Sequence, residues 1–328
     1  MVALNKLPDM VRRTWRDLSW SSEEVPVQGM DHAVMILRGI SSTEGELQGM
    51  VPESTVVRVP HEAEYRDQAP LESALISQLF RGSSVRVPET VRQAYARGTF
   101  NTPNPVMLTL QTEVTGKPLT KELWGTLNED QREWAAEQLG SLLASMHTMD
   151  PDLLPVSRVE NWWSDGAATS TLNESARTLP GKFALMKSRV ADFLAPNLTD
   201  EEMEAVEENF AKIDQLLARP HQQRCLTHSD LFHSHLLWNA EGGVGVIDFS
   251  DMTVGDPAVD YCHFVDIDPG LQERVLQLAL ENGPEDLYQV VDGVPRLLER
   301  ARIYKQWDNI FLLIDHYRTG RSPRVQLL

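Results

Sequence analysis

Residues 227 to 237 read THSDLFHSHLL, and residues 244 to 249 read VGVIDF. The first stretch surrounds Asp230 with three histidines, and the second carries Asp248 near its end. The runs HLLW and VGVIDF flank the glycine-containing turn NAEGG, which is the pattern of a β-hairpin. A hairpin would bring a functional group from each side of the turn toward one place.

The histidines of the first stretch raise the possibility of a zinc site. His228, His233 and His235 could supply nitrogen ligands. The chain has neither the paired Cys/His spacings of structural zinc nor an HExxH motif, so zinc is the weaker interpretation.

The order of the residues fits a phosphotransferase catalytic loop better. Such a loop follows the pattern H-x-D-x-x-x-x-N, in which the aspartate accepts the proton of the substrate hydroxyl and the last residue binds magnesium. His228 and Asp230 begin this pattern, and His235 stands where the pattern has asparagine. Neutral imidazole also ligates divalent metals. Asp248 would be the second metal ligand, as in the DFG segment of protein kinases.

Residues 225 to 264, CLTHSDLFHSHLLWNAEGGVGVIDFSDMTVGDPAVDYCHF, resemble the aminoglycoside phosphotransferase family of small-molecule kinases. The histidine at 235 is most similar to the aminoglycoside 2''-phosphotransferases and the macrolide 2'-phosphotransferases. The resemblance implies an α+β, protein-kinase-like bilobal fold. It assigns Asp230 as catalytic base and His235 and Asp248 as metal ligands, with Mg²⁺ as the metal and ATP or GTP as the phosphate donor.

The motif GDPAVD at residues 255 to 260 matches the GDPxxD segment of the same family. We expect Asp256 and Asp260 to fix loops rather than to contact the substrate.

The resemblance also assigns nucleotide-binding residues to the first part of the chain. Gly29 would let the backbone approach the phosphates. Arg58 would grip them in place of the usual lysine, paired with Glu72 on the next helix. The expected lobe-connecting hinge covers residues 111 to 118. Its backbone would hold the nucleotide base at Gln111, Glu113 and Val114.

The domain division follows the change of pattern along the chain. Residues 1 to 118 are expected to form a small β-rich, nucleotide-binding lobe, and residues 119 to 328 a larger helical lobe with the catalytic loop and the substrate site. The periodicities predict strands over 33–37, 55–59 and 106–114 and a helix over 71–80, followed by helices over 128–146, 199–217, 271–282 and 295–318. Asn128 and Thr199 are the expected N-caps of two of these helices. Residues 1 to 25 carry no pattern that predicts a structure.

The substrate is the property that the sequence predicts least well. Asp266 and Asp268 are candidate contacts to a cationic antibiotic such as an aminoglycoside. For the later acidic residues, Glu281, Glu285 and Asp286, we instead expect solvated positions at helix ends. A macrolide would instead need an apolar wall, for which the candidates are Trp162, Trp163, Trp307 and Phe311, although aromatics at helical spacing are more often core.

Composition limits the other possibilities. The formal charge of −18 argues against a protein that works mainly on nucleic acid backbone. An acidic surface can serve solubility alone, or it can form an acidic cleft that attracts a cationic ligand, and composition does not choose between the two. Two cysteines suit a reducing cytoplasm, and no apolar run is long enough to cross a membrane. We expect a cytoplasmic monomer. A metabolic kinase acting on an amino alcohol or sugar stays open, because fold does not fix substrate. A pseudokinase is disfavoured, because its catalytic and metal positions would not all be filled.

Overall fold

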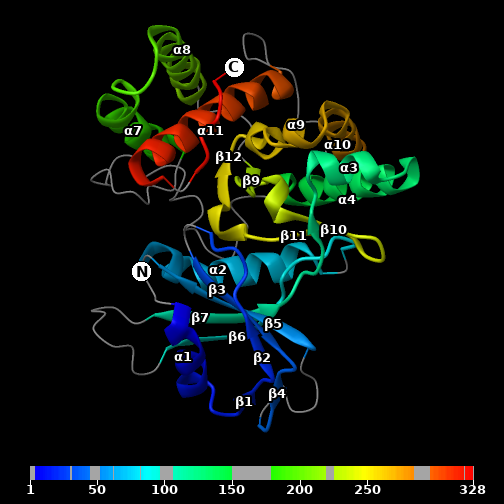
Figure 1. Cartoon of the computed structure of the whole chain (residues 1–328). Coiled ribbons are helices and arrows are strands. Elements are labelled where there is room, and N and C mark those ends of the chain that lie inside the picture. The colour runs from blue at the N-terminus through cyan, green and yellow to red at the C-terminus, as the bar shows by residue number, and fades with distance from the viewer. Residues whose placement is uncertain are drawn as a thin grey trace. The chain divides into compact units, whose positions relative to one another are not determined.

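A computed structural model gives the structure of the chain (Figure 1). It describes residues 4–29, 32–44, 52–61, 63–81, 83–96, 106–149, 179–218, 225–283, 296–320 and 322–327. Two compact units divide the chain: a sheet unit, Met1–Lys117 with Leu237–Ser250, and a helical unit, Pro118–Leu236 with Asp251–Leu328. The N-terminal part is rich in strands and the C-terminal part in helices, which confirms the predicted α+β class. Among the helices described here, none has the length and apolar character needed to span a membrane.

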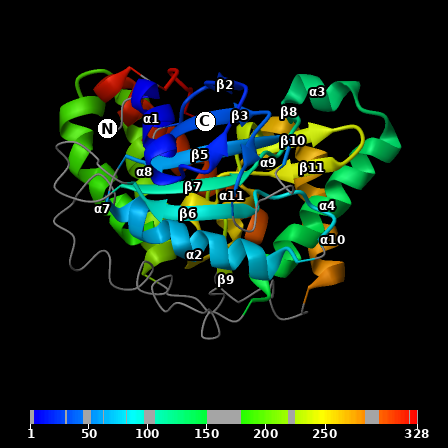
Figure 2. The same cartoon turned by 90° about the horizontal axis from the view of Figure 1, so that it is seen from below.

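The centre of the sheet unit is a five-stranded sheet with the strand order β2-β3-β5-β7-β6. All its neighbouring strands pair antiparallel, as Figure 2 lets the reader follow. The strands are β2 (Ser22–Glu24), β3 (His32–Arg38), β5 (Ser54–Pro60), β7 (Met107–Thr112) and β6 (Thr90–Tyr95). The three strands predicted from apolar runs are therefore confirmed as β3, β5 and β7. The edge strand β6 was missed, because its sequence TVRQAY lacks a clear alternation of apolar and polar residues.

One face of this sheet packs on the N-terminal segment that the sequence did not explain. Helix α1 (Leu7–Thr14) contributes Leu7 and Val11, which join Val57 and Val59 in one buried apolar core. Since side chains alternate along a strand, Arg58 must point to the opposite face. That face carries helix α2 (Ala63–Leu79). The pleat of β5 thus explains why a charged residue stands between two core valines.

Helix α2 begins earlier than predicted. The apolar stripe indicated residues 71 to 80, whereas the helix runs from Ala63 to Leu79 and contains Pro70. The polar first turns gave no periodic signal, and an internal proline normally argues for a helix start.

The predicted hairpin is present in the sheet unit. Strands β10 (Leu236–Asn239) and β11 (Gly243–Val246) are neighbours, and β10 also pairs with the short strand β8 (Lys117–Pro118). A further short pair joins β1 (Leu18–Ser19) to β4 (Ser41–Ser42).

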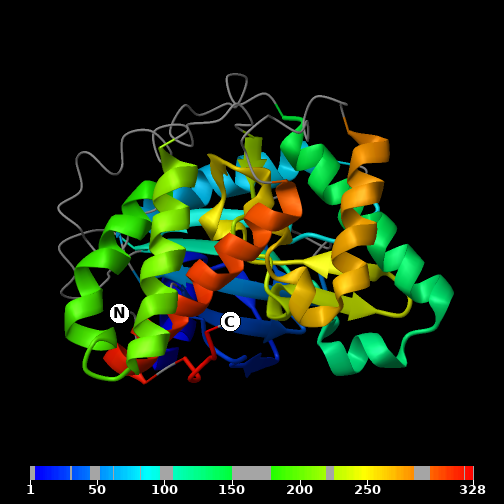
Figure 3. The ribbon, with the colours of Figure 1, turned by 90° about the horizontal axis from the view of Figure 1, so that it is seen from above.

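The helical unit is built around two groups of helices. Helix α10 packs on α4, and α11 packs on α7 and α8; Figure 3 shows the orange-to-red α11 beside the green α7 and α8. The bounds are α3 (Lys121–Thr126), α4 (Glu129–His147), α7 (Leu179–Arg189), α8 (Asp200–Leu217), α9 (Phe264–Ile267), α10 (Pro269–Asn282) and α11 (Leu297–Thr319). Strand β9 (Cys225–Thr227) pairs antiparallel with β12 (Thr253–Gly255).

The helix caps agree with the sequence. Asn128 and Thr199 both form capping boxes, with Gln131 and Glu202 as the reciprocal partners. The four helices predicted after residue 118 correspond to α4, α8, α10 and α11. Helices α3, α7 and α9 were not predicted.

Candidate active site

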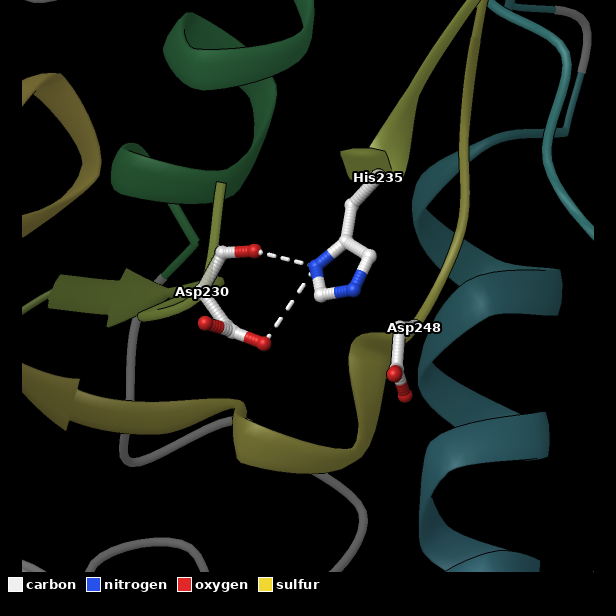
Figure 4. Close-up of side chains that lie close together, drawn as sticks. All are labelled: Asp230, His235 and Asp248. Atoms are coloured by element: carbon white, nitrogen blue, oxygen red, sulfur yellow. Dashed lines mark hydrogen bonds and ion pairs between the residues drawn. The ribbon is translucent and has the colours of Figure 1, made fainter. Parts of the chain in front are cut away.

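Asp230 and His235 lie together in the helical unit, in the loop that follows β9 (Figure 4). The Nδ1 atom of His235 lies 2.8 Å from the carbonyl oxygen of Asp230 and 3.3 Å from its Oδ2. A carbonyl oxygen can only accept, so Nδ1 carries the hydrogen. In the neutral ring the lone pair is then on Nε2, the nitrogen that can ligate a metal. The hydrogen bond therefore fixes the tautomer in which Nε2 is the nitrogen that can act as a metal ligand.

The backbone before Asp230 is held from beneath by a buried carboxylate. Asp260 is fully buried and accepts hydrogen bonds from the N–H groups of His228, at 3.0 Å, and Ser229, at 2.7 Å. Ser229 has a φ of 67°, which is an unfavourable conformation for a residue with a side chain. The two bonds to Asp260 stabilise this strained turn. Asp260 thus fixes the loop, as the sequence predicted.

A residue that the sequence analysis missed completes this arrangement. The Nε2 atom of His147, at the end of α4, lies 2.9 Å from Oδ2 of Asp260, and the His147 side chain is buried. A histidine that ends a helix of mostly core residues gave no separate signal in the sequence. Only its contact with Asp260 distinguishes it.

Asp256 fixes the other end of the GDPAVD turn. Its carboxylate accepts from Nε and Nη2 of Arg300 on α11, at 2.7 and 2.9 Å, and from the hydroxyl of Tyr304 at 3.3 Å. It also accepts from the N–H of Ala258, which caps the turn. Burial, together with the Asp256 charge, raises the pKa of Tyr304 well above its usual value. Both aspartates of the motif therefore make structural contacts.

In the sheet unit, Arg58 joins two of the predicted residues. Its guanidinium donates to Glu72 on α2 at 2.6 Å and to Oδ1 of Asp248 at 2.6 Å. The Ser250 hydroxyl donates to the same Asp248 oxygen at 2.8 Å. The expected pair of Arg58 and Glu72 is present and buried.

The backbone at Asp248 is also strained. Its φ is 65°, and Ser229 and Asp248 are the two residues other than glycine with a positive φ in the described part of the chain. Strained backbone concentrates at functional sites. Both strained residues fall inside the two sequence stretches that predicted the chemistry.

The segment predicted to be the hinge is anchored by side-chain contacts. The Glu113 carboxylate accepts from Arg38 on β3, with Nη2 at 3.1 Å, and from the Ser54 hydroxyl. A Cβ on Gly245 would overlap Cγ1 of Val114, so β11 passes close to the hinge. Gln111 is buried on β7. These contacts fix the backbone of residues 111 to 114 within the sheet unit.

Beside Arg58 there is a small cavity of about 10 Å³, lined by polar residues such as Glu72 and Gln111 and by apolar ones such as Ile76. A space of this size holds about one water molecule and no larger ligand. Gly29 lies in exposed coil between β2 and β3, and a Cβ there would meet nothing within 4 Å. The structure therefore shows no steric need for glycine at this position, and its phosphate role stays a prediction.

The two candidate substrate residues have structural partners. Asp266 accepts from Lys305 at 2.6 Å, and Asp268 caps α10 by accepting from the N–H of Leu271 at 3.1 Å. Trp307 is buried, as expected for a core residue. Trp162, Trp163, Glu285 and Asp286 lie outside the described residues.

The loop that contains Asp230 also makes an aromatic contact near Asp266. The ring of Phe232, two residues after Asp230, stacks on His263 with centroids 3.6 Å apart. The Nδ1 atom of His263 lies 3.4 Å from Oδ2 of Asp266, and its Nε2 atom lies 3.6 Å from Oδ2 of Asp308. Burial lowers the pKa of His263, but Cys262, Asp266 and Asp308 raise it, to about 10. The ring that stacks on Phe232 is thus itself held between two carboxylates.

Residues 38–292 match the model of the phosphotransferase enzyme family (APH). Viomycin phosphotransferase of Streptomyces vinaceus is 25% identical over 235 residues, which cover 68% of this chain and 71% of that protein.

Solved structures show the same fold. The GDP and kanamycin complex of APH(2'')-IIIa aligns with a TM-score of 0.69 at 18% identity, covering 96% of this chain and 93% of that one. The macrolide 2'-phosphotransferase MphH from Brachybacterium faecium aligns with a TM-score of 0.57 at 18% identity, covering 97% and 94%. These structures confirm the kinase-like fold that the sequence predicted.

Proposed function

The chain belongs to the phosphotransferase enzyme family, a family of kinase-type enzymes, and we propose that it phosphorylates a hydroxyl group of a cationic antibiotic. The proposed acceptor is an aminoglycoside, and the donor is ATP or GTP with Mg²⁺. The observation that carries the proposal is the loop of Asp230, His235 and Asp260. There, the buried carboxylate of Asp260 fixes the strained turn at Ser229, and this turn leads to the half-buried carboxylate of Asp230.

In the proposed reaction Asp230 orients the acceptor hydroxyl and accepts its proton. As that proton leaves, the hydroxyl oxygen forms a bond to the γ-phosphorus. The bond from the γ-phosphorus to the bridging oxygen breaks, and the nucleoside diphosphate departs with the electron pair. Such a reaction depends on positioning and on charge neutralisation. The Asp260 contacts supply the positioning of Asp230.

The donor set fits a divalent metal. His235 offers an imidazole nitrogen, and Asp230 and Asp248 offer carboxylate oxygens, which are ligands that Mg²⁺ or a similar ion accepts. We assign His235 and Asp248 as the residues that would hold it. Bound there, Mg²⁺ would offset part of the negative charge of the triphosphate.

The sheet unit supplies the proposed nucleotide site. Arg58, oriented by Glu72, would hold phosphate oxygens, and the backbone of residues 111 to 114 would bind the base. The GDP found in the solved complex of APH(2'')-IIIa supports a nucleotide partner. The choice between ATP and GTP depends on hinge contacts with the base.

The acceptor class rests on charge. A chain with a formal charge of −18 attracts polycationic ligands better than neutral ones. The kanamycin in the complex of APH(2'')-IIIa is consistent with an aminoglycoside. Viomycin is the second candidate acceptor, because the curated relative that acts on it matches two thirds of the chain.

A steady-state transfer assay with Mg²⁺ tests the proposal. It would offer ATP and GTP separately with kanamycin, a macrolide, viomycin, and a panel of amino alcohols and sugars. Turnover of kanamycin above the others supports the proposal. Turnover confined to the macrolide or to viomycin would replace the aminoglycoside by that class. Turnover of an amino alcohol or sugar alone would identify a metabolic kinase. No transfer to any acceptor by a folded, nucleotide-binding protein would overturn the proposed function.

A further inference from the structure

Arg86, in the loop between α2 and β6, is bonded to the hinge and the hairpin at once. Its guanidinium donates to the carbonyl oxygens of Thr115 at 2.6 Å, Leu237 at 3.2 Å, Gly242 at 3.2 Å and Gly243 at 2.8 Å. Thr115 belongs to the hinge, and the other three residues belong to the hairpin that leads to Asp248. One side chain therefore joins the two segments to which the proposed function assigns the nucleotide base and a metal ligand.

The acceptors make this a site for arginine in particular. A guanidinium presents five N–H donors in a rigid planar fork, which can serve several carbonyl oxygens in different directions. Burial lowers the pKa of Arg86, but an arginine stays charged in proteins. A lysine would offer a single point charge with three donors on a flexible stem, so it could not hold all four oxygens.

The backbone around the guanidinium approaches closely enough to exclude side chains. A Cβ on Gly242 would lie 2.7 Å from Nε of Arg86, and a Cβ on Gly116 would lie 2.8 Å from the carbonyl oxygen of Trp238. The main chain of Arg86 joins β11 as well, because its carbonyl accepts from the N–H of Val246 at 2.8 Å. The hinge, the hairpin and Arg86 thus form one closely packed group inside the sheet unit.

We propose that Arg86 is a positioning residue that sets the hinge backbone and the Asp248-bearing hairpin in one fixed relation, so that the base and the metal-bound phosphates of one nucleotide are held together. Arg86 contacts main-chain carbonyls and acts on the nucleotide through them. This role rests on the proposed function, since it presupposes a nucleotide at these two segments.

The test compares wild type with Arg86→Met and Arg86→Lys. Methionine keeps the apolar stem and removes all the donors. We expect amide hydrogen exchange in residues 113–117 and 237–246 to become at least about tenfold faster in Arg86→Met, as for the loss of hydrogen bonds to a charged group. The KM for the nucleotide should rise roughly tenfold, while the KM for the acceptor stays within about twofold. In Arg86→Lys, both the exchange rates and the KM for the nucleotide should lie between those of wild type and Arg86→Met.

Arg132 provides the matched control. It also donates to main-chain carbonyls, those of Trp124 at 3.1 Å and Gly125 at 3.2 Å, but it lies on α4 in the helical unit. Arg132→Met should lower the melting temperature without changing the exchange of the hinge and hairpin amides or the KM for the nucleotide.

Three outcomes would overturn the role of Arg86. Exchange in both segments could stay unchanged in Arg86→Met, the KM values for nucleotide and acceptor could rise equally, or Arg132→Met could reproduce the nucleotide effect. If Arg86→Met does not fold, Arg86→Lys and Gly242→Ala give the same comparison, since the added Cβ would displace Nε of Arg86. The exchange measurement needs no turnover. A wild-type protein without transfer activity would therefore refute the proposed function, while exchange would still decide whether Arg86 fixes the two segments.

Discussion

The ring of His147 and the carboxylate of Asp260 form a buried pair, with Nε2 and Oδ2 2.9 Å apart. The same carboxylate accepts from the backbone of His228 and Ser229. A side chain at the end of α4 is thereby connected, through one aspartate, to the strained turn that presents Asp230. A buried charge needs such partners, because each unsatisfied group would cost free energy.

We therefore expect Asp260→Asn to lower both stability and turnover. The amide places an N–H₂ group among donors that the carboxylate had satisfied, so the free energy of unfolding should fall by about 3 kcal/mol. The measurement is urea-induced unfolding, with turnover measured on the fraction that stays folded. Glu208→Gln, which removes an exposed pair with Lys212, is the control and should leave both quantities unchanged. An Asp260→Asn protein as active as wild type would remove Asp260 from the support of the loop.

Asp230→Ala should remove transfer without removing the nucleotide. Loss of a general base costs about 10²- to 10⁴-fold in rate, and no nucleotide contact is assigned to Asp230. We expect turnover to fall in this range while the Kd for the nucleotide with Mg²⁺ stays within about threefold. His233→Gln, a change at the half-buried neighbouring histidine, should retain full activity. Near wild-type turnover in Asp230→Ala would assign the base to another residue.

Asp248→Ala should abolish the metal dependence of nucleotide binding. It removes a proposed metal ligand and also the carboxylate that pairs with Arg58 at 2.6 Å. Calorimetric titration of the nucleotide at increasing Mg²⁺ should show the affinity rising in wild type and staying flat in the variant. Glu241→Gln, in the exposed hairpin turn, should behave as wild type. An unchanged Mg²⁺ response in Asp248→Ala would contradict the assignment.

The raised pKa of His263 predicts how stability changes with pH. The pKa is about 10 in the folded protein, against the ordinary histidine value of 6.5, so the folded state binds the proton more tightly. The stabilisation is complete below about pH 6.5 and is lost as the pH rises toward 10. The free energy of unfolding, measured in urea from pH 6 to pH 10, should therefore decrease with pH.

His263→Gln should flatten that decrease, because glutamine does not titrate. His316→Gln is the control, since His316 contacts a carbonyl oxygen, that of Ser322 at 2.8 Å, and should keep the wild-type slope. If the slope is the same in wild type and His263→Gln, the proton on His263 does not stabilise the folded protein.

Much of the fold could be predicted from local patterns. The apolar runs of β3, β5 and β7 and the capping boxes at Asn128 and Thr199 depend on residues a few positions apart, so the sequence predicted them correctly. The hairpin before Asp248 belongs to the same class, because its turn residues are adjacent. Two elements were missed for different reasons: α1 is only eight residues long and contains a proline, and β6 has no clear alternation of apolar and polar residues.

The sequence by itself therefore determined the family, the kinase-type chemistry and the candidate residues Asp230, His235 and Asp248, because these are fixed by order and spacing. The tertiary structure alone decided which residues support them. His147 is 113 positions from Asp260, and Arg86 is 156 positions from Gly242. Contacts over such separations arise only when packing brings the chain together, and single residues of this kind leave no periodic signal in the sequence.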